Sequence, residues 1–181
     1  MTDSRQEQRV QTLLNDPALA GTWTLEPERS SVRFVSKILW GLIPVNGRFG
    51  DVSGEARITP DGQLSGRLRI RADSVRTGIG MRDRHLRAAD FFDAANHPDI
   101  VVTISGVAPD SGLTATLSIR GTTLPLALQT SVERLSQGAG VESIGVNARA
   151  EIDRTRYGVG TTMLGMMPPG TVLSADAVFV R

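Results

Sequence analysis

The segment RDRHLRAADFFDAANHP, residues 82–98, holds both histidines of the chain together with three aspartates. Imidazole and carboxylate groups are the usual components of acid–base, hydrolytic and metal sites. His85 and His97 are twelve positions apart, whereas two histidines that bind a metal from one helix stand three or four apart. No available serine lies in a nucleophile-elbow motif, and the closeness of Asp83 to His85 in sequence does not place them in contact. We therefore expect capping and salt bridging from this cluster, with no catalytic residue and no metal.

The polar residues of this segment are well suited to begin helical turns. Asp83 can cap a short helix that runs through Leu86, and Asp90 can cap a second turn in which Phe91 and Phe92 become buried. The sequence predicts a short helix over about residues 83–93. It interrupts a series of strands, and we expect it to cover one end of them.

The composition limits the function. With 181 residues the chain fits one domain. Its 20 basic and 19 acidic residues leave a net charge of +1, so no long-range field favours nucleic acid or an anionic membrane. The basic residues are nearly all arginine, which suits a local contact to phosphate or carboxylate. Cysteine is absent, which excludes disulfides, thiol catalysis and thiolate metal sites.

Residues 1–20 differ from the rest of the chain. They contain no apolar run of signal-peptide length, so we expect a cytoplasmic protein. Ser4 and Glu7 have the spacing of a capping box, and Pro17 ends the pattern, which predicts an amphipathic helix from Ser4 to Asn15. This N-terminal helical extension is expected to pack on the domain; a membrane or partner anchor is the alternative.

From Trp23 onward, apolar residues recur at every second position, which is typical of strands with one buried face. In SVRFVSKILW, for example, Val32, Phe34 and Trp40 share a face. The other alternating runs are RLRIRA, LTATLSI, TLPLALQTSV, SIGVNARAEI and TVLSADAVFV. Eight or nine one-sided strands in meander order must hide their apolar faces and edges, and closure into an antiparallel up-and-down barrel achieves this. We expect an eight-stranded barrel.

The interior of such a barrel is either filled or hollow, depending on the size of the inward residues. Many of them are small here, and aromatic residues make up only 4% of the chain. A cavity lined by alanine and aliphatic residues would suit an apolar ligand. A narrow, closely packed core is the alternative. The small residues expected inside are Ala56, Ala115, Ala148, Ala150, Ala175 and Ala177.

Six pieces of sequence occur in a characteristic order along the chain: SSVRF, VNGRFGDVSG, DSVRTG, RDRHLRAADFFDAANHP, LSIRGTTLPL and IDRTRYGVG. On these pieces the chain resembles, from about residue 23 to residue 181, the YceI-like family of polyisoprenoid-binding, lipocalin-like barrel proteins. The resemblance implies a YceI-like β-barrel domain over residues 21–181, an apolar interior that holds a long isoprenoid chain with its polar head group near the mouth, and a helix formed by RDRHLR. Family members often have a histidine at the position of Arg29 and another near Ile38, and methionines occupy the late loop TTMLGMMPPG, where relatives often have tryptophan and polar residues.

These observations together predict a non-catalytic carrier of a long apolar lipid, a polyisoprenoid or an isoprenoid quinone, with no other cofactor. The alternatives are an isoprenoid- or ester-processing enzyme that uses Arg82, Asp83 or His85, and a lipid-free regulatory interaction module. We expect no nucleic-acid partner and no stable membrane insertion; a homodimer stays open. The expected ligand-binding residues, with Arg82 and His85 near the polar head and the methionines in a lid, are Phe34, Trp40, Leu68, Ile70, Arg82, His85, Leu117, Leu126, Val146, Met163, Met166 and Phe179.

Overall fold

The computed structural model describes residues 12–107, 113–136, 141–160 and 166–181. The described chain is mainly β-structure, as expected, in one antiparallel sheet of twelve strands. The first strands are β1 (Gly21–Leu25), β2 (Ser31–Ile38), β3 (Ile43–Phe49), β4 (Val52–Ile58), β5 (Leu64–Arg71) and β6 (Val75–Arg76). After the helix α2 (Gly80–Arg87) follow β7 (Asp99–Val107), β8 (Leu113–Ile119), β9 (Thr122–Leu126), β10 (Gln129–Ser136), β11 (Ser143–Asp153) and β12 (Gly170–Val180). Short 3-10 helices span Pro17–Leu19, Pro27–Arg29, Ala72–Ser74 and Arg154–Tyr157.

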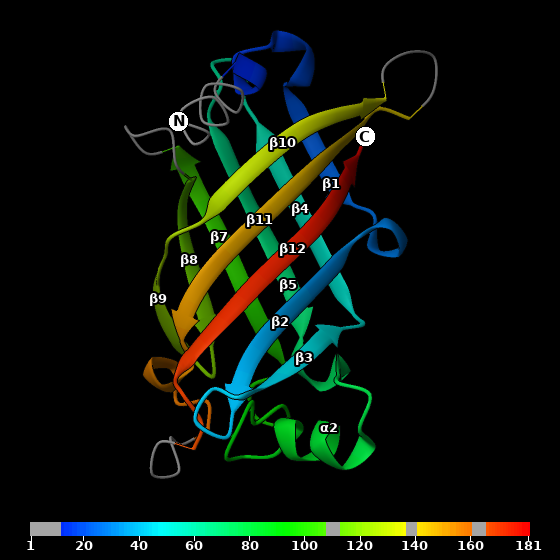
Figure 1. The fold of residues 1–181 in the computed structure, drawn as a ribbon. Helices are drawn as coiled ribbons and strands as arrows, with labels where there is room; N and C mark the ends of the chain where they lie inside the picture. Colours follow the sequence, from blue (N-terminus) through cyan, green and yellow to red (C-terminus); the bar gives the residue numbers. More distant parts are fainter. Residues whose placement is uncertain (1–11, 108–112, 137–140, 161–165) are drawn as a thin grey trace.

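Strand β12 is the centre of the sheet (Figure 1). Along one edge it pairs with β11 over its whole length, from Gly170 to Val180, and β11 pairs in turn with β10. Along the other edge it pairs first with β2 and then, near its end, with β1. From β1 the sheet continues through β4, β5, β7 and β8 to β9, and from β2 through β3 to β6.

The expected count of eight strands is wrong, because some runs that alternate continuously are divided. Proline lacks a backbone N–H, and Pro27 begins the 3-10 turn that separates β1 from β2 along the same edge of β12. The run TLPLALQTSV forms two strands, β9 and β10, that pair with different partners. Pro125 lies in β9, at the end of the pairing order, where a missing N–H is tolerated.

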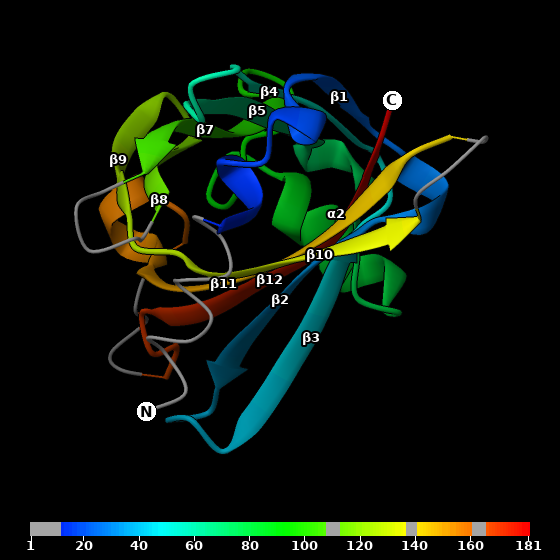
Figure 2. The same ribbon diagram turned by 90° about the horizontal axis from the view of Figure 1, so that it is seen from above.

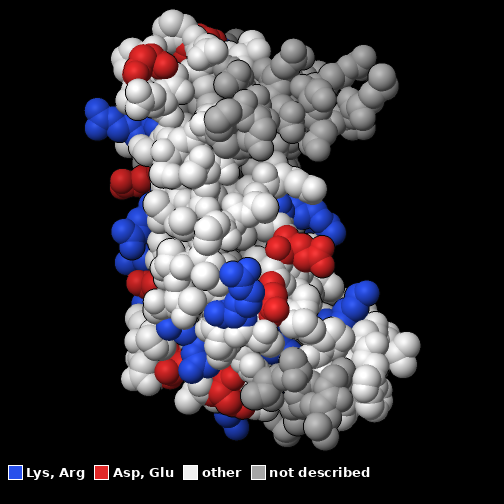
Figure 3. Space-filling model, turned by 90° about the vertical axis from the view of Figure 1, so that its left-hand side faces the viewer, with Lys and Arg blue, Asp and Glu red and all other residues white. Residues whose placement is uncertain are grey.

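Seen from above, the sheet curls around an interior (Figure 2). The chain passes directly from β9, at the end of one pairing path, to β10, at the end of the other. No strand ladder among the described residues joins β9 to β10, so the sheet is curled but unclosed, and the expected closure into an up-and-down barrel is wrong for the described strands. The face in Figure 3 carries charges of both signs without a large patch of one sign, as the balanced composition predicts.

Helix α2 covers the lower end of the sheet in Figure 1. It spans Gly80–Arg87 rather than the expected 83–93. Asp83 lies in its first turn and is buried, so it does not cap the helix as predicted. Asp90 bonds to His85, and the residues after the helix form turns that begin where Ala88 becomes extended.

The opposite end of the sheet is closed by the segment that precedes β1. Leu14 and Leu19 are buried against Trp23, whose indole N–H donates to the Leu19 carbonyl at 2.9 Å. The guanidinium of Arg181 lies 4.7 Å from the centre of the Trp23 ring. Most of the predicted helix from Ser4 to Asn15 lies outside the described residues. No helix in the described part of the chain has the length and apolar character needed to cross a membrane.

Candidate functional site

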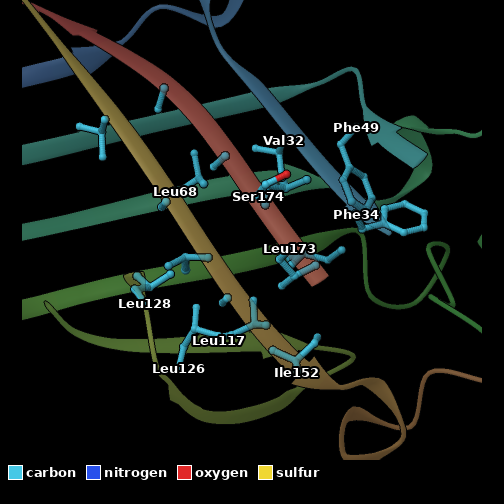
Figure 4. A pocket seen from close by; sticks show the side chains of 18 of the residues that line it. Val32, Phe34, Phe49, Leu68, Leu117, Leu126, Leu128, Ile152, Leu173 and Ser174 are labelled. Atoms are coloured by element: carbon cyan, nitrogen blue, oxygen red, sulfur yellow. The ribbon is translucent and has the colours of Figure 1, made fainter. Parts of the chain in front are cut away.

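The curled sheet encloses an apolar cavity of about 310 Å³ (Figure 4). The inward faces of β2, β5, β8, β11 and β12 supply much of its wall, because the alternation of side chains along each strand directs one set of apolar residues inward. The volume falls at the lower end of the roughly 300–1,000 Å³ typical of small-molecule sites. Of the two alternatives left open by the sequence, the structure therefore favours the hollow interior.

The hollow lies where the two longest strands place small side chains next to each other. In the β11–β12 ladder, Val146 pairs with Ala177 and Ala148 pairs with Ala175, and all four line the cavity. Ala148, Ala175 and Ala177 are only partly buried although they face inward, as residues that border an internal space should be. Small residues on both strands leave this part of the interior unfilled.

Three phenylalanines form an aromatic cluster at the α2 end of the cavity. The ring centres of Phe34 and Phe49, and those of Phe49 and Phe92, are 5.7 Å apart, and Phe34 and Phe92 are separated by 6.5 Å. Phe34 lies across Gly47, its partner on β3, and a Cβ atom at Gly47 would come within 2.2 Å of the ring. The glycine of VNGRFG is thus needed for Phe34 to lie flat on the sheet.

The polar residues around α2 satisfy one another rather than form a reactive centre. Asp83 Oδ1 accepts hydrogen bonds from the Thr77 hydroxyl at 2.5 Å and the Thr77 backbone N–H at 2.7 Å. The hydrogen bond from the Thr77 hydroxyl is the main reason why the pKa of Asp83 is lowered. Arg82 Nε donates to the same hydroxyl, and its Nη2 donates to the Thr77 carbonyl at 3.0 Å. Arg82 also borders the cavity.

His85 lies on the outside of this end. Its Nε2 is 2.8 Å from Asp90 Oδ2, its ring packs against Phe91, and its side chain is 62% exposed. The hydrogen bond from His85 is the largest cause of a lowered pKa at Asp90. His85 and Asp83 therefore have separate partners. No group of three or more potential metal-binding His, Cys, Asp or Glu residues occurs among the described positions.

Arg154 is a buried cation on the cavity wall that the sequence analysis did not single out, although it lies in the motif IDRTRYGVG. Its guanidinium donates to the carbonyls of Val159, at 2.6 Å, and Met167, at 3.0 Å. Burial lowers the pKa of this guanidinium. The contacts tie the turn after β11 to the segment that leads into β12, and Met167 also lines the cavity.

Most of the expected ligand-binding residues lie on the cavity wall: Phe34, Leu68, Ile70, Arg82, Leu117, Leu126, Val146 and Phe179. Trp40, His85 and Met166 do not line it, and Met163 lies outside the described residues. The strand alternation failed at Trp40, because β2 ends at Ile38 and Trp40 stands in the following turn with a φ of 55° and 66% exposure.

The expected set also omitted Phe49 and Phe92. Phe49 could have been found from the alternation of Val45, Gly47 and Phe49 in β3. For Phe92 the sequence predicted burial, but the position of its turn relative to the cavity is a tertiary feature that no local pattern encodes.

Comparison with known proteins agrees with this architecture. The structure resembles that of BcnA from Burkholderia cenocepacia, with a TM-score of 0.72 and 21% identity over 85% of this chain and 98% of that one. A polyisoprenoid binding domain from Saccharophagus degradans gives a TM-score of 0.71 and 20% identity over 87% and 97% of the two chains. Both likenesses concern the fold.

In sequence, the chain is 30% identical over 100 residues to Protein YceI of Escherichia coli and of Shigella sonnei. That stretch is 52% of this chain and 51% of each relative, so the match spans about half the length of these curated proteins. The description of the family that matches residues 23–181 is YceI-like domain. The match covers most of the chain and confirms the resemblance found in the sequence motifs: the chain belongs to the family of YceI-like domains.

Proposed function

We propose that this protein is a non-catalytic carrier that holds a long apolar lipid, a polyisoprenoid or an isoprenoid quinone, inside its curled sheet. The observation that carries the proposal is the apolar cavity of about 310 Å³ in the interior. Membership of the YceI-like family supports it, as does the similar fold of a domain described as polyisoprenoid binding. We further propose that the lining residues named above are the binding residues, with Arg82 nearest the polar head.

The binding energy in this proposal comes from burial of hydrocarbon. Each buried methylene contributes about 0.8 kcal/mol, so a five-carbon isoprene unit contributes roughly 4 kcal/mol before the costs of ordering the chain. A few units are then sufficient for useful affinity. The aromatic cluster of Phe34, Phe49 and Phe92 lies at the same end as Arg82, and in this proposal it packs against the part of the lipid chain next to the polar head.

A carrier needs no reactive group, and the hydrogen bonds around α2 fit that role. Asp83 and Arg82 are both engaged by Thr77, while His85 bonds to Asp90 on the exposed side. Turnover of a prenyl diphosphate or an ester that disappears in His85→Ala would overturn the carrier proposal in favour of an enzyme. The cytoplasmic location stays a prediction, which cell fractionation would test. Analytical ultracentrifugation would show whether the protein forms a homodimer.

Native mass spectrometry of the purified protein tests the proposal most directly. We expect a copurified hydrocarbon chain that dissociates on activation and is recovered by extraction with organic solvent. If the protein carries no lipid and also fails to bind an added fluorescent polyprenol, the proposal is refuted and an interaction module becomes the better account.

A further inference from the structure

The turn between β2 and β3 presents large apolar side chains to solvent. Trp40 is 66% exposed, Leu42 80% and Ile43 44%. Met166 is also exposed and lies beside them, because its carbonyl accepts a hydrogen bond from the Trp40 backbone N–H at 3.2 Å. We call these four residues the hairpin tip. Single exposed apolar residues are ordinary on protein surfaces, but a group of large ones indicates a surface that meets a partner.

The hairpin tip is a protrusion. Ile38 pairs with Ile43 at the end of the β2–β3 ladder, and the intervening turn has positive φ angles at Leu39, Trp40 and Gly41. Figure 2 shows β2 and β3 extending away from the ring formed by the other strands. A projecting apolar tip can insert into a soft surface such as a bilayer, in which tryptophan prefers the interfacial region.

The charges near the hairpin tip favour an anionic surface. From residue 29 to residue 50 the chain has four basic residues and no acidic one. Within this segment Arg29 pairs with Glu26 and Arg33 with Asp176. Lys37, which precedes the last residue of β2, has no ion-pair partner among the described residues and is available to a lipid phosphate. The sequence predicted no long-range attraction to membranes from the net charge, and this local feature is compatible with that prediction.

The cavity wall reaches the base of the same hairpin. Ser36, Ile38 and Val45, on the two strands that carry the tip, line the cavity, as does Met167 next to Met166. We propose that the hairpin tip docks on anionic phospholipid bilayers, with Trp40 and Leu42 inserted at the level of the head groups and Lys37 against lipid phosphate. Docking brings the bilayer to one end of the cavity. The purpose of docking would be the exchange of lipid between the cavity and the bilayer, and this purpose rests on the proposed carrier function. Docking itself does not depend on that function.

Binding to vesicles of phosphatidylcholine and phosphatidylglycerol in equal parts, measured by cosedimentation, tests this proposal. We expect Trp40→Ser with Leu42→Ser to weaken binding about tenfold or more, because each side chain loses the transfer of its apolar surface. Lys37→Gln should weaken binding about fivefold on these vesicles and leave it unchanged on phosphatidylcholine alone. Brominated lipids should quench the fluorescence of Trp40 and not that of Trp23, which is fully buried.

Leu135→Ser is the matched control, since Leu135 is 42% exposed and lies near the opposite end of the sheet on β10. It should bind vesicles as the wild type does, and unchanged thermal unfolding of all variants would show that the fold is kept. Ala148→Phe, which obstructs the cavity, should also still dock. Vesicle binding that is lost in Ala148→Phe, or is unaffected by the double substitution at the tip, would overturn the proposal. So would a wild-type dimer that ignores vesicles and dissociates on the same double substitution, because the tip would then contact a second copy.

Discussion

Replacing Ala148 by phenylalanine distinguishes a ligand cavity from an ordinary core. Ala148 faces the interior from β11, opposite Ala175 on β12, and both line the cavity. The substitution adds a phenyl ring to a region with only small side chains. In a hollow interior the ring enters free space, whereas in a packed core it forces neighbouring side chains and backbone apart.

The expected change in the free energy of unfolding has opposite signs for a hollow interior and for a packed core. Filling a cavity commonly raises the free energy of unfolding by about 0.5–2 kcal/mol, while overpacking a full core lowers it by roughly 1–3 kcal/mol. The ring takes up about as much hydrocarbon as one isoprene unit. The lost burial of that unit, roughly 4 kcal/mol at about 0.8 kcal/mol per carbon, corresponds to an affinity that is weaker by several hundredfold for a chain that fills the cavity.

Urea unfolding and titration with a fluorescent polyprenol measure the two quantities. We expect Ala148→Phe to be as stable as the wild type or more so, and to bind the lipid several hundredfold more weakly. The control is Asn147→Phe, which adds the same ring to the exposed face of the same strand. A destabilised Ala148→Phe that retains full lipid affinity would refute the reasoning, because it would mean that the interior is full and the ligand binds elsewhere. If the register of β11 differed from that described, Ala148→Phe would not differ from Asn147→Phe in its effects on stability and lipid affinity in the expected way.

Three further predictions follow from the hydrogen bonds and the late loop. Replacing Arg154 by Met should lower the free energy of unfolding by about 2–4 kcal/mol, because two carbonyls lose their donor, and chemical denaturation will measure this. Since the pKa of Asp83 is lowered in the folded protein, mainly by the hydrogen bond from the Thr77 hydroxyl, its carboxylate stabilises the fold above about pH 4, and this contribution is lost as the pH falls. Thr77→Ala should therefore be destabilising at neutral pH, and thermal unfolding should show that this destabilisation becomes smaller as the pH is lowered below about 4. Replacing Met166 and Met167 by Ser should speed dissociation of a fluorescent lipid in stopped-flow experiments if this loop is the lid, and an unchanged rate would direct attention to α2.

Local patterns in the sequence predicted the walls of the cavity better than its ends. Alternation depends on the period of the strand itself, and it correctly placed Phe34, Leu117 and Phe179 on the wall. It failed at Trp40, where three residues in succession have positive φ angles and the period is lost. The position of α2 was predicted approximately, but its start was not, because Asp83 bonds to Thr77 instead of capping the helix.

The number of strands depends on which distant segments of the chain pair with one another. The alternation of apolar and polar residues along one segment does not predict that pairing. Pro27 could be read as a break, yet nothing local indicates that β1 and β2 share one edge of β12. Arg154 shows a related limit in the site, since the carbonyls that it binds, those of Val159 and Met167, follow it in irregular turns whose course no periodic pattern predicts. Residues whose role depends on a turn or on a distant partner are therefore the ones that sequence reasoning missed.

The hollow interior is itself an argument for a ligand. An apolar cavity that no side chain fills lowers stability, because the atoms that line it lack packing partners on one side. The chain could avoid much of this cost with larger residues at Ala148, Ala175 and Ala177, which already face the space. A lipid that fills the cavity offsets the cost and binds only the folded state, so it should raise the melting temperature in proportion to the logarithm of its concentration over its Kd. In the proposed carrier, the alanines that weaken the packing of the unliganded protein are the same residues that make room for the lipid.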